Sequence, residues 1–498
     1  MNSARTVSMN IQRRCASFVL VRFGMLASLV SACGSSSIDD LTTPGGEGGG
    51  GATGPVLPGP GTPGTGNGGS GIDFGDPGGN GNPGCMGTTC APAPSNCPGG
   101  GQTTISGTVY APSGTLPLYN VMVYVPSAPL EPLSSGATCA CEVSGSPVAS
   151  AITDTAGRFS IVNPPVGTDV PLVIQVGKWR RQFTIDTVSE CADTSVPDRA
   201  LRLPARKGEG DLPRIALTTG NADALECLVR KLGIDESEFT PPSGSGNINY
   251  FAGEGGTARY ESAMNGGADF PDAEQLWSSV DSLRPYDVVL LSCEGDKDFD
   301  ENKPDGAFEA LYDYTNLGGR VFASHWHQIW LQRGPEPFPE IAEFVDEDDL
   351  DEITADVVTS FPKGAALADW LVNVDATAQR GRIDLTGTQH TIEAENPQFA
   401  QRWIATSDPQ TVQYLSANTP FGAPAEQQCG RVVLSDIHVT GSEDEGRDTS
   451  GDDLEFPEGC ITTDLSPQEK VLAYMLFDIS ACIVPDNQPP APPPIILR

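Results

Sequence analysis

The fold of the C-terminal half is decided by one stretch, residues 214–233, which reads RIALTTGNADALECLVRKLG. Its first seven residues, up to Gly220, form an apolar run of the length of a buried strand. Apolar residues then recur at helical spacing from a predicted N-cap at Asn221 to a stop at Gly233. A strand that leads directly into a helix is typical of an α/β domain. This stretch therefore predicts a mainly parallel sheet.

The same alternation continues along the chain. Further strands are predicted over 286–292, 320–324 and 430–435, with a helix ahead of Gly318-Gly319. Ser466 and Glu469 form a predicted capping box that opens a last helix through Phe477. Because strand–helix–strand connections are crossovers, we predict a flavodoxin-like domain over 211–484. Residues near 331–420 are expected to be an irregular acidic insertion in it.

Residues 103–206 have a different pattern, with five short alternating strands predicted over 104–110, 121–125, 157–161, 171–176 and 181–185. Such strands predict a small antiparallel β-sandwich. The residues Ile105-x-Gly107-x-Val109, Asn120-Val121-x-Val123, Thr153-Asp154-x-x-Gly157-x-Phe159 and Pro165-x-Gly167 resemble the carboxypeptidase regulatory-like, transthyretin-type domain. That resemblance implies a rigid spacer or adhesion module without peptidase activity.

The N-terminus has the features of an export signal. Residues 1–32 hold four arginines and no acidic residue, and they end in an apolar run too short to span a bilayer. The sequence Leu29-Val-Ser-Ala-Cys33 resembles a lipobox, which implies lipidation of Cys33 after cleavage. Gly34 in place of aspartate then implies the outer membrane. Glycine- and proline-rich residues 33–102 predict a disordered tether, and residues 485–498 a disordered Pro-rich tail.

Charge and cysteine content restrict the partners and the compartment. A net charge of −36 argues against nucleic acid as a partner. Thirteen cysteines favour an oxidising compartment. Beyond Cys33 the cysteines fall into three groups of odd number, in the tether, the sandwich and the α/β domain. Either disulfides connect these regions or some thiols stay free.

Three of the four histidines follow predicted strands, where an open parallel sheet binds its ligands. Cys293 and Glu294 follow the strand at 286–292, His325-Trp-His327 follows the strand at 320–324, and Asp436-Ile-His438 follows the strand at 430–435. Composition alone does not explain such clustering. These strand ends are therefore the candidate site.

The segments Gly318-Gly-Arg-Val-Phe-Ala-Ser-His325 and Gly430-Arg-Val-Val-Leu-Ser-Asp-Ile-His438 resemble the ThuA-like branch of the class I glutamine amidotransferase-like fold. In that fold, true amidotransferases carry a cysteine nucleophile on the sharp turn after the third strand. Here Ser324 stands in place of the cysteine and Trp326 in place of a required glycine. This departure disfavours glutaminase chemistry.

Three interpretations of the histidines remain open. If the chain stays extended, His325 and His327 share a face and could hold a divalent metal ion together with His438 and Asp436. Alternatively, His325 or His438 acts as a general base near Glu294 in a hydrolase. The third possibility is that they are polar plugs, hydrogen-bonded at the sheet ends. For Cys293, a disulfide partner or a buried thiol is the preferred interpretation, and a nucleophile is the second.

A weaker pattern follows the strand at 286–292. Asp298, Asp300, Asn302 and Glu309 have the spacing of a calcium-binding loop. Lys303 stands where the sharp turn of that loop needs a glycine, so solvated acids ahead of a helix are favoured.

These features favour a cell-envelope lipoprotein, held to the membrane by its lipid anchor, that presents a non-catalytic binding module to a glycan or an envelope protein. The alternative is a hydrolase of carbohydrate-related substrates, with or without metal assistance, that uses the strand-end histidines.

Overall fold

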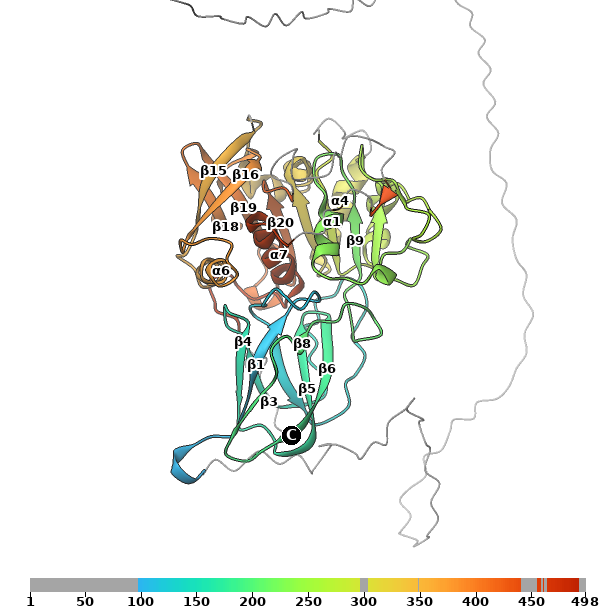
Figure 1. The fold of residues 1–498 in the computed structure, drawn as a ribbon. Helices are drawn as coiled ribbons and strands as arrows, with labels where there is room; N and C mark the ends of the chain where they lie inside the picture. The colour runs from blue at the N-terminus through green and yellow to red at the C-terminus, as the bar shows by residue number, and fades with distance from the viewer. Residues whose placement is uncertain are drawn as a thin grey trace, which may run out of the picture. The chain divides into compact units, whose positions relative to one another are not determined.

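The computed structural model describes residues 97–295, 303–347, 349–439, 455–457, 460 and 464–491, all within one compact unit, residues 78–498 (Figure 1). The predicted signal peptide, Cys33 and most of the tether lie outside the described residues. Described residues 97–202 form the β-sandwich, and the later ones form the α/β domain.

The sandwich consists of two sheets. One has the order β4-β1-β7, with β8 also on β1; the other has the order β3-β2-β5-β6. Val109, Val121 and Phe159, which suit the interior of the resembled family, are buried. The strands are β1 (Thr104–Tyr110), β2 (Met122–Pro126), β3 (Pro147–Ile152), β4 (Arg158–Val162), β5 (Gly167–Val176), β6 (Trp179–Val188), β7 (Asp193–Ser195) and β8 (Leu201–Arg202). All five predicted strands are present, and β3, β7 and β8 are additional.

A nine-stranded sheet organises the α/β domain, in the order β10-β9-β12-β13-β20-β19-β18-β15-β16. The first five are parallel: β9 (Ile215–Thr218), β10 (Ile248–Phe251), β12 (Val288–Leu291), β13 (Arg320–Ser324) and β20 (Gly430–Ser435). Their spatial order, taken in chain order, is 2-1-3-4-5, the flavodoxin-like arrangement. The predicted fold class is confirmed.

The expectation of an irregular insertion at 331–420 is wrong. This region supplies β15 (Leu350–Val357), β16 (Arg382–Thr388), β18 (Ala400–Ser407) and β19 (Gln410–Thr419), which continue the sheet as antiparallel strands. In Figure 1 these strands lie on the side of the sheet opposite β9. Four short strands of the described residues form two pairs outside the main sheet: β11 (Arg259–Tyr260) with β21 (Glu455–Phe456), and β14 (Ala342–Phe344) with β17 (Ile392–Glu395).

Helices cover both faces of the sheet. Val288 and Leu290 of β12 belong to one apolar cluster, and Val289 and Leu291 belong to the other, as strand alternation requires. The first cluster includes α1 (Leu225–Lys231), α6 (Pro362–Asn373) and α7 (Pro467–Ser480). The second includes α2 (Ala273–Trp277), α3 (Val280–Leu283), α4 (Asp305–Asn316) and α5 (Ile329–Gln332).

Two predicted helix boundaries can be compared with the structure. Helix α1 has Ala224, not Asn221, at its N-cap, and the chain leaves it at Gly233 with a left-handed φ of 90°. The capping box of α7 is present, with Ser466 accepting from the Glu469 amide and Glu469 accepting from the Ser466 amide. This helix continues to Ser480, beyond the predicted end at Phe477.

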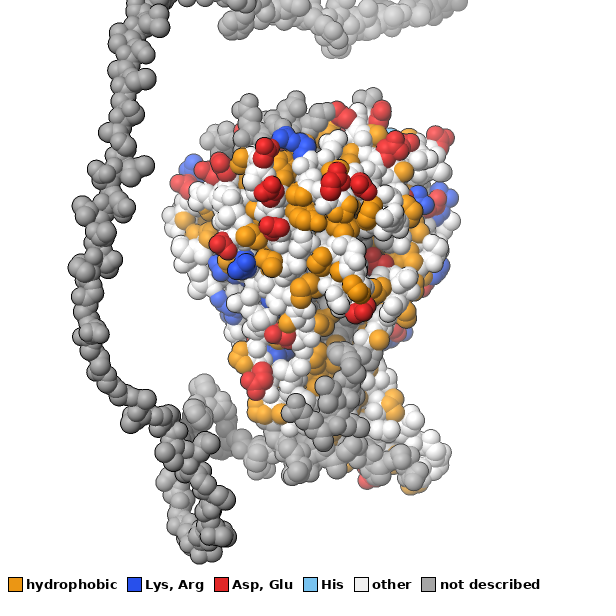
Figure 2. Space-filling view, turned by 180° about the vertical axis from the view of Figure 1, so that it is seen from behind, with side chains coloured by type: hydrophobic (Ala, Val, Ile, Leu, Met, Phe, Trp, Pro, Cys, Tyr) orange, Lys and Arg blue, Asp and Glu red, His pale blue; other side chains and the backbone are white. Residues whose placement is uncertain are grey.

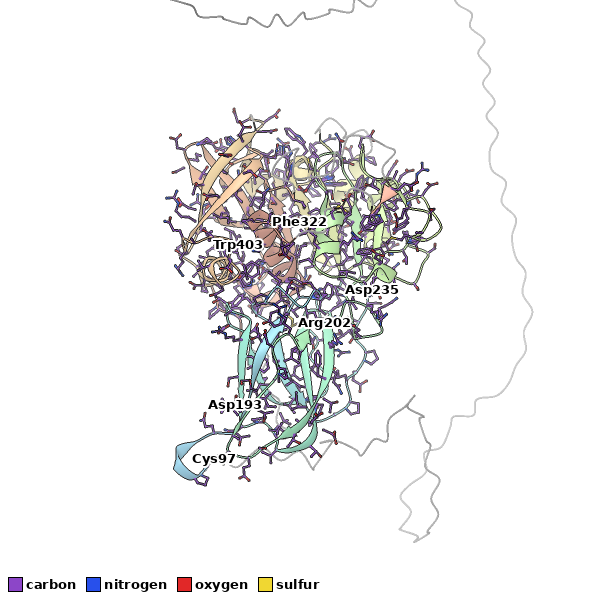
Figure 3. All side chains as sticks on the ribbon, viewed as in Figure 1. Cys97, Asp193, Arg202, Asp235, Phe322 and Trp403 are labelled. Atoms are coloured by element: carbon purple, nitrogen blue, oxygen red, sulfur yellow. A yellow bond between two sulfur atoms is a disulfide. The ribbon has the colours of Figure 1, made fainter. Side chains whose placement is uncertain are left out.

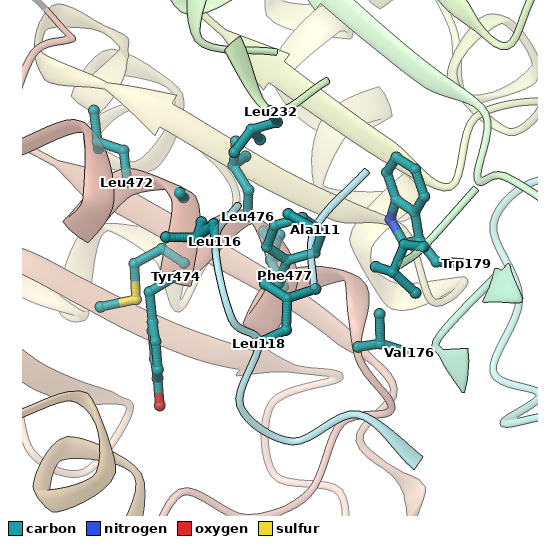
Figure 4. Close-up of a cluster of buried hydrophobic side chains, with 14 of the residues drawn as sticks. Ala111, Leu116, Leu118, Val176, Trp179, Leu232, Leu472, Tyr474, Leu476 and Phe477 are labelled. Atoms are coloured by element: carbon teal, nitrogen blue, oxygen red, sulfur yellow. The ribbon is translucent and has the colours of Figure 1, made fainter. Parts of the chain in front are cut away.

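An apolar interface joins the sandwich to α7 (Figure 4). The Trp179 and Phe477 rings lie 6.1 Å apart, and Tyr119 stacks on Tyr474 at the same centroid distance. The indole of Trp370 donates a hydrogen bond to the Pro117 carbonyl at 2.8 Å. Because buried rings on both sides interdigitate, the two domains pack as one body rather than as independent modules.

Four disulfides join the described cysteines and explain why the sandwich and the α/β domain each hold an odd number. Cys97, labelled in Figure 3, pairs with Cys191 and ties the end of the tether to the sandwich. Cys139–Cys429 and Cys141–Cys482 connect the sandwich to the α/β domain. Cys227–Cys460 lies within the α/β domain, and Cys293 is the free cysteine of the described residues. Such bridges are consistent with the oxidising compartment expected from the sequence.

Part of the predicted disordered tail is ordered. Asp486 forms ion pairs with the buried side chains of Arg431 and Lys363, so the chain before residue 492 is held against the α/β domain. Elsewhere, acidic side chains are spread over the face shown in Figure 2 and basic ones are fewer. No helix in the described ranges has both the length and the apolar character needed to cross a bilayer.

Candidate metal centre

The predicted strand ends meet at one edge of the sheet. Strands β9, β12, β13 and β20 are adjacent and parallel, so the residues that follow them converge at their carboxyl ends. The approach is close: a β-carbon on Gly220, after β9, would lie 2.2 Å from the Cys293 carbonyl oxygen. Only glycine at this position allows the two loops to meet.

The turn after β13 sets the direction of the histidines. His325 has a left-handed φ of 44°, a conformation that costs a non-glycine residue of order 1 kcal/mol and that often marks functional sites. A 3-10 turn then runs from His325 to Gln328. The chain therefore does not stay extended, and His325 and His327 do not share a face as predicted.

His325 and His438 are brought together with Cys293. One potential ligand atom from each of these three side chains lies within 4.8 Å of the other two. The Cys293 Sγ is 3.2 Å from His325 Nδ1, and the two imidazole centroids are 5.3 Å apart. Cys293 is fully buried, and each histidine is 4% exposed. The His438 Nε2 is buried and has no hydrogen-bond partner among the described residues.

Burial keeps these three groups uncharged in the metal-free protein. Loss of hydration lowers the pKa of His325 to about 2, with further lowering from His438 and His327. The pKa of His438 is also lowered by burial. Burial raises the pKa of the Cys293 thiol well above its ordinary value. The pair at 3.2 Å is therefore a neutral thiol beside a neutral imidazole at pH 7.

His327 is directed elsewhere. Its Nε2 donates to the Ser292 carbonyl at 2.8 Å, and its Nδ1 accepts from the Trp330 indole at 3.0 Å. Both ring nitrogens are used, so His327 is the hydrogen-bonded plug that the third interpretation described. Its assignment as a metal ligand is corrected.

Asp436 is also not a member of the group. Its two carboxylate oxygens accept from the Thr391 amide at 2.7 Å and from the Thr391 hydroxyl at 2.6 Å. Burial raises its pKa to about 6, although these hydrogen bonds act in the opposite direction. The side chain anchors a neighbouring loop, and its prediction as a metal ligand is corrected.

Glu294 has a cation as its partner instead of an imidazole. Its carboxylate lies 2.5 Å from the Lys303 ammonium and accepts from the Glu254 amide at 3.1 Å. Lys303 and Glu294 are both buried, and the ammonium lies 5.2 Å from the centroid of the Trp277 ring. The described contacts of Glu294 are those of a structural ion pair, not of a general acid or base beside His325 or His438.

Only the last residue of the predicted calcium-binding loop, Glu309, lies within the described residues. Asp298, Asp300 and Asn302 lie outside the described residues, whereas Glu309 is an exposed residue of α4. Lys303, which replaces the loop glycine, is the partner of Glu294.

One thiol and two imidazoles can hold a metal ion. A deprotonated cysteine with two neutral histidines is a ligand set for zinc or copper, whereas calcium and magnesium require oxygen ligands. Sequence reasoning identified the two histidines and placed Cys293 at the same strand ends, but it interpreted the cysteine as structural. The signal available was its position directly after β12, next to the switch in strand order.

Comparisons with known proteins add little to this geometry. No family model matches the chain, and no curated protein matches it. A ThuA-like protein from Bacteroides uniformis is similar over 53% of this chain and 90% of its own, with 10% identity and a TM-score of 0.27. A type II cohesin–X-dockerin complex from Acetivibrio cellulolyticus is similar over 29% of this chain and 78% of its own, with 18% identity and a TM-score of 0.15. Scores this low carry no argument about function.

Proposed function

We propose that this protein is an extracytoplasmic binding protein whose α/β domain holds one transition-metal ion on Cys293, His325 and His438. The observation that carries the proposal is the buried group itself, in which the His438 Nε2 has no hydrogen-bond partner among the described residues. An unsatisfied buried nitrogen costs about 1–3 kcal/mol, and a metal ion would remove that cost. The strained backbone of His325 has the same explanation, since it aims the ring at Cys293.

Burial favours metal binding over turnover of a large substrate. None of the three residues is more than 4% exposed, so a glycan could not reach the thiol without rearrangement of the surrounding loops. A single ion needs only the space between the ligands. The site is thus a binding centre in an otherwise closed end of the sheet.

Metal content tests the proposal. The purified full chain is expected to carry, or after chelation to take up, about one Zn²⁺ per chain, because three ligands make one site. Cys293→Ser, His325→Ala and His438→Ala should each lower the bound metal more than tenfold in elemental analysis. His390→Ala is the matched control, since His390 pairs with Glu393 and lies outside the group. Equal metal content in all of these proteins would contradict the proposal.

A hydrolase acting on carbohydrate-related substrates is the second candidate. The Cys293 Sγ and His325 Nδ1 are at the distance of a nucleophile and its base. Burial opposes it, because the raised pKa of the thiol leaves little thiolate. Turnover of glycoside or ester probes that is lost in Cys293→Ser and persists in the chelated wild type would favour a thiol hydrolase over a metal site. Turnover that chelation abolishes would favour metal-assisted hydrolysis instead.

The location of the protein is part of the proposal. We infer that lipid on Cys33 holds it at the outer membrane, where the module meets a glycan or an envelope protein. Its support is the lipobox-like sequence and the disulfides.

Replacing Cys33 tests the anchor. Cys33→Ala is expected to move the protein from the membrane pellet to the soluble fraction after cell breakage, because the acyl chains supply the membrane affinity. Immunoblots of the two fractions measure this. A variant that stays in the pellet as completely as the wild type would exclude lipid on Cys33 as the anchor.

A further inference from the structure

Asp223 connects the two turns that carry the histidines. It lies in the loop between β9 and α1 and is fully buried. One carboxylate oxygen accepts from the Ser324 hydroxyl at 2.6 Å, and the other accepts from the Val439 amide at 2.8 Å. Ser324 precedes His325 and Val439 follows His438, so a single carboxylate fixes both histidine-bearing turns relative to each other.

Asp223 has a different environment from three other acids of this domain that are shielded from water. Glu294, Asp478 and Glu469 each form an ion pair with a lysine. Asp223 has no ion pair with a Lys or Arg of the described residues, and its contacts are the two hydrogen bonds above. A buried carboxylate without a cation costs several kcal/mol, which a nearby positive charge would offset.

The charge of Asp223 acts on the metal ligands. Burial raises the pKa of the Cys293 thiol and the charge of Asp223 raises it further, whereas backbone hydrogen bonds lower it. Burial lowers the pKa of His438, and the charge of Asp223 opposes this. Because this carboxylate bonds to Ser324 and Val439, the immediate neighbours of His325 and His438, it lies where its charge would stabilise a cation held by the group.

Charge balance then selects the ion. With metal bound, Cys293 is a thiolate and both imidazoles are neutral, so the ligands carry one negative charge. Asp223 adds a second, whereas Glu294 and Lys303 cancel. A divalent ion balances the thiolate and Asp223, whereas a monovalent ion such as Cu⁺ leaves one of these two negative charges uncompensated. The charge of Asp349 also acts on His438, but Asp349 is exposed and water screens it.

We propose that Asp223 is the positioning residue of the centre and that its charge makes the site prefer a divalent over a monovalent ion. This inference rests on the proposed metal site. It names a residue that the ligand set does not contain, and it narrows the ligand to the divalent transition-metal class, with Zn²⁺ as the ion to test.

Asp223→Asn separates charge from geometry. The amide oxygen can still accept from Val439 and the amide nitrogen can donate to the Ser324 oxygen, so the turns keep their places while the charge is lost. Zn²⁺ affinity measured by chelator competition should fall about 10–100-fold, the usual effect of an outer-shell residue. Cu⁺ affinity measured anaerobically should fall only about 3–10-fold, because a monovalent ion loses half the attraction that a divalent ion loses, so the ratio of the two affinities shifts about 3–10-fold.

The control is Asp436→Asn. Asp436 is equally buried, also accepts one amide and one hydroxyl, and lies at the same sheet edge without contacting the group. Its affinity ratio should match that of the wild type. Saturated Co²⁺ forms of the wild type, Asp223→Asn and Asp436→Asn should share one thiolate absorption band, whereas Asp223→Ala, which loses both hydrogen bonds, should shift it.

The outcomes separate the two proposals. A wild type that binds neither Zn²⁺ nor Cu⁺ overturns the metal site and this inference with it. A wild type that binds Zn²⁺, with an unchanged Zn²⁺ to Cu⁺ ratio in Asp223→Asn, overturns this inference alone. Should Asp223→Asn fail to fold, Asp223→Ser provides a smaller uncharged side chain for the same measurement, and Asp223→Glu, which keeps the charge, should retain the Zn²⁺ preference.

Discussion

Removing both disulfides between the domains is expected to destabilise the protein by more than the sum of the two single removals. The bridges Cys139–Cys429 and Cys141–Cys482 span 290 and 341 residues of sequence. While one of these bridges is intact, forming the other closes only a short loop, which consists of residues 139–141 and 429–482. Each paired variant, Cys139→Ser/Cys429→Ser or Cys141→Ser/Cys482→Ser, should therefore lose about 2–4 kcal/mol of unfolding free energy.

The variant without either bridge must close a longer path, which runs from Cys139 to Cys227, through the remaining Cys227–Cys460 bridge and on to Cys429. This path is about twice as long as the one that either bridge closes while the other is intact. Because loop-closure entropy grows by about 0.6 kcal/mol for each doubling of length, the variant should lose about 0.6 kcal/mol more than the sum of the single losses. Urea unfolding curves measure the three variants, and separate transitions for sandwich and α/β domain would show their uncoupling.

A third bridge provides the control for this coupling. Cys97–Cys191 spans 94 residues, and its closing path does not shorten through the Cys139–Cys429 bridge. Combined removal of these two should be additive within about 0.3 kcal/mol. If removal of the two interdomain bridges were also additive, the two bridges would stabilise the protein independently of each other, contrary to this prediction.

Arg431→Met is expected to cost about 3–5 kcal/mol, because it leaves buried carboxylates without their main cation. The Arg431 side chain is 1% exposed and forms ion pairs with Asp478 and Asp486, while its Nε donates to Asn418 at 2.9 Å. Lys363 lies 3.0 Å from Asp478 and cannot balance two acids alone. Urea midpoints at constant m-value measure the loss.

The pH dependence of this loss has a definite direction. Burial acts to raise the pKa of Asp478, but the charges of Lys363 and Arg431 outweigh it and lower the pKa below its ordinary value. The group then stabilises the fold above the unfolded-state pKa of about 3.9, and this stabilisation is lost as the pH falls through the folded pKa. The difference between the wild type and Arg431→Met should therefore shrink between pH 7 and pH 3.

Arg382→Met is the matched control in the same sheet. Arg382 lies 3.6 Å from Asp356, but its side chain is 46% exposed and water screens the pair. Its loss should stay below about 1 kcal/mol at either pH. Comparable losses for the two arginines would refute the role of burial in the Arg431 network.

Short-range pattern was sufficient for the elements of the fold. The apolar runs at 215–218, 288–291, 320–324 and 430–435 are strands because such runs are typical of sheets buried on both faces. Ser466 and Glu469 predict the start of α7 because a capping box satisfies backbone donors within one turn. The parallel order follows from the helices between these strands, which force crossovers.

The strands at 350–419 could not be predicted from such local signals. Strand β15 begins with exposed acidic residues and alternates only from Thr354 to Val357, and β19 is buried on both faces, so neither shows a full-length half-buried pattern. Their place is decided by pairing with each other and with β20. Hydrogen bonding between distant segments, not the residues of each segment, makes them part of the sheet.

The sequence by itself determined the two folded regions, the parallel half of the sheet and the edge at which Cys293, His325 and His438 would converge, because strand ends in parallel sheets share an edge. Only the tertiary structure decided which cysteines pair and which of the predicted residues come together in the candidate metal site. The left-handed turn at His325 directs the His327 ring to the Ser292 carbonyl, and the Asp436 carboxylate is hydrogen-bonded to Thr391. The direction of a side chain depends on backbone angles and neighbours that a linear pattern does not record. For this reason the sequence could not show that the third member of the group is Cys293 rather than His327 or Asp436.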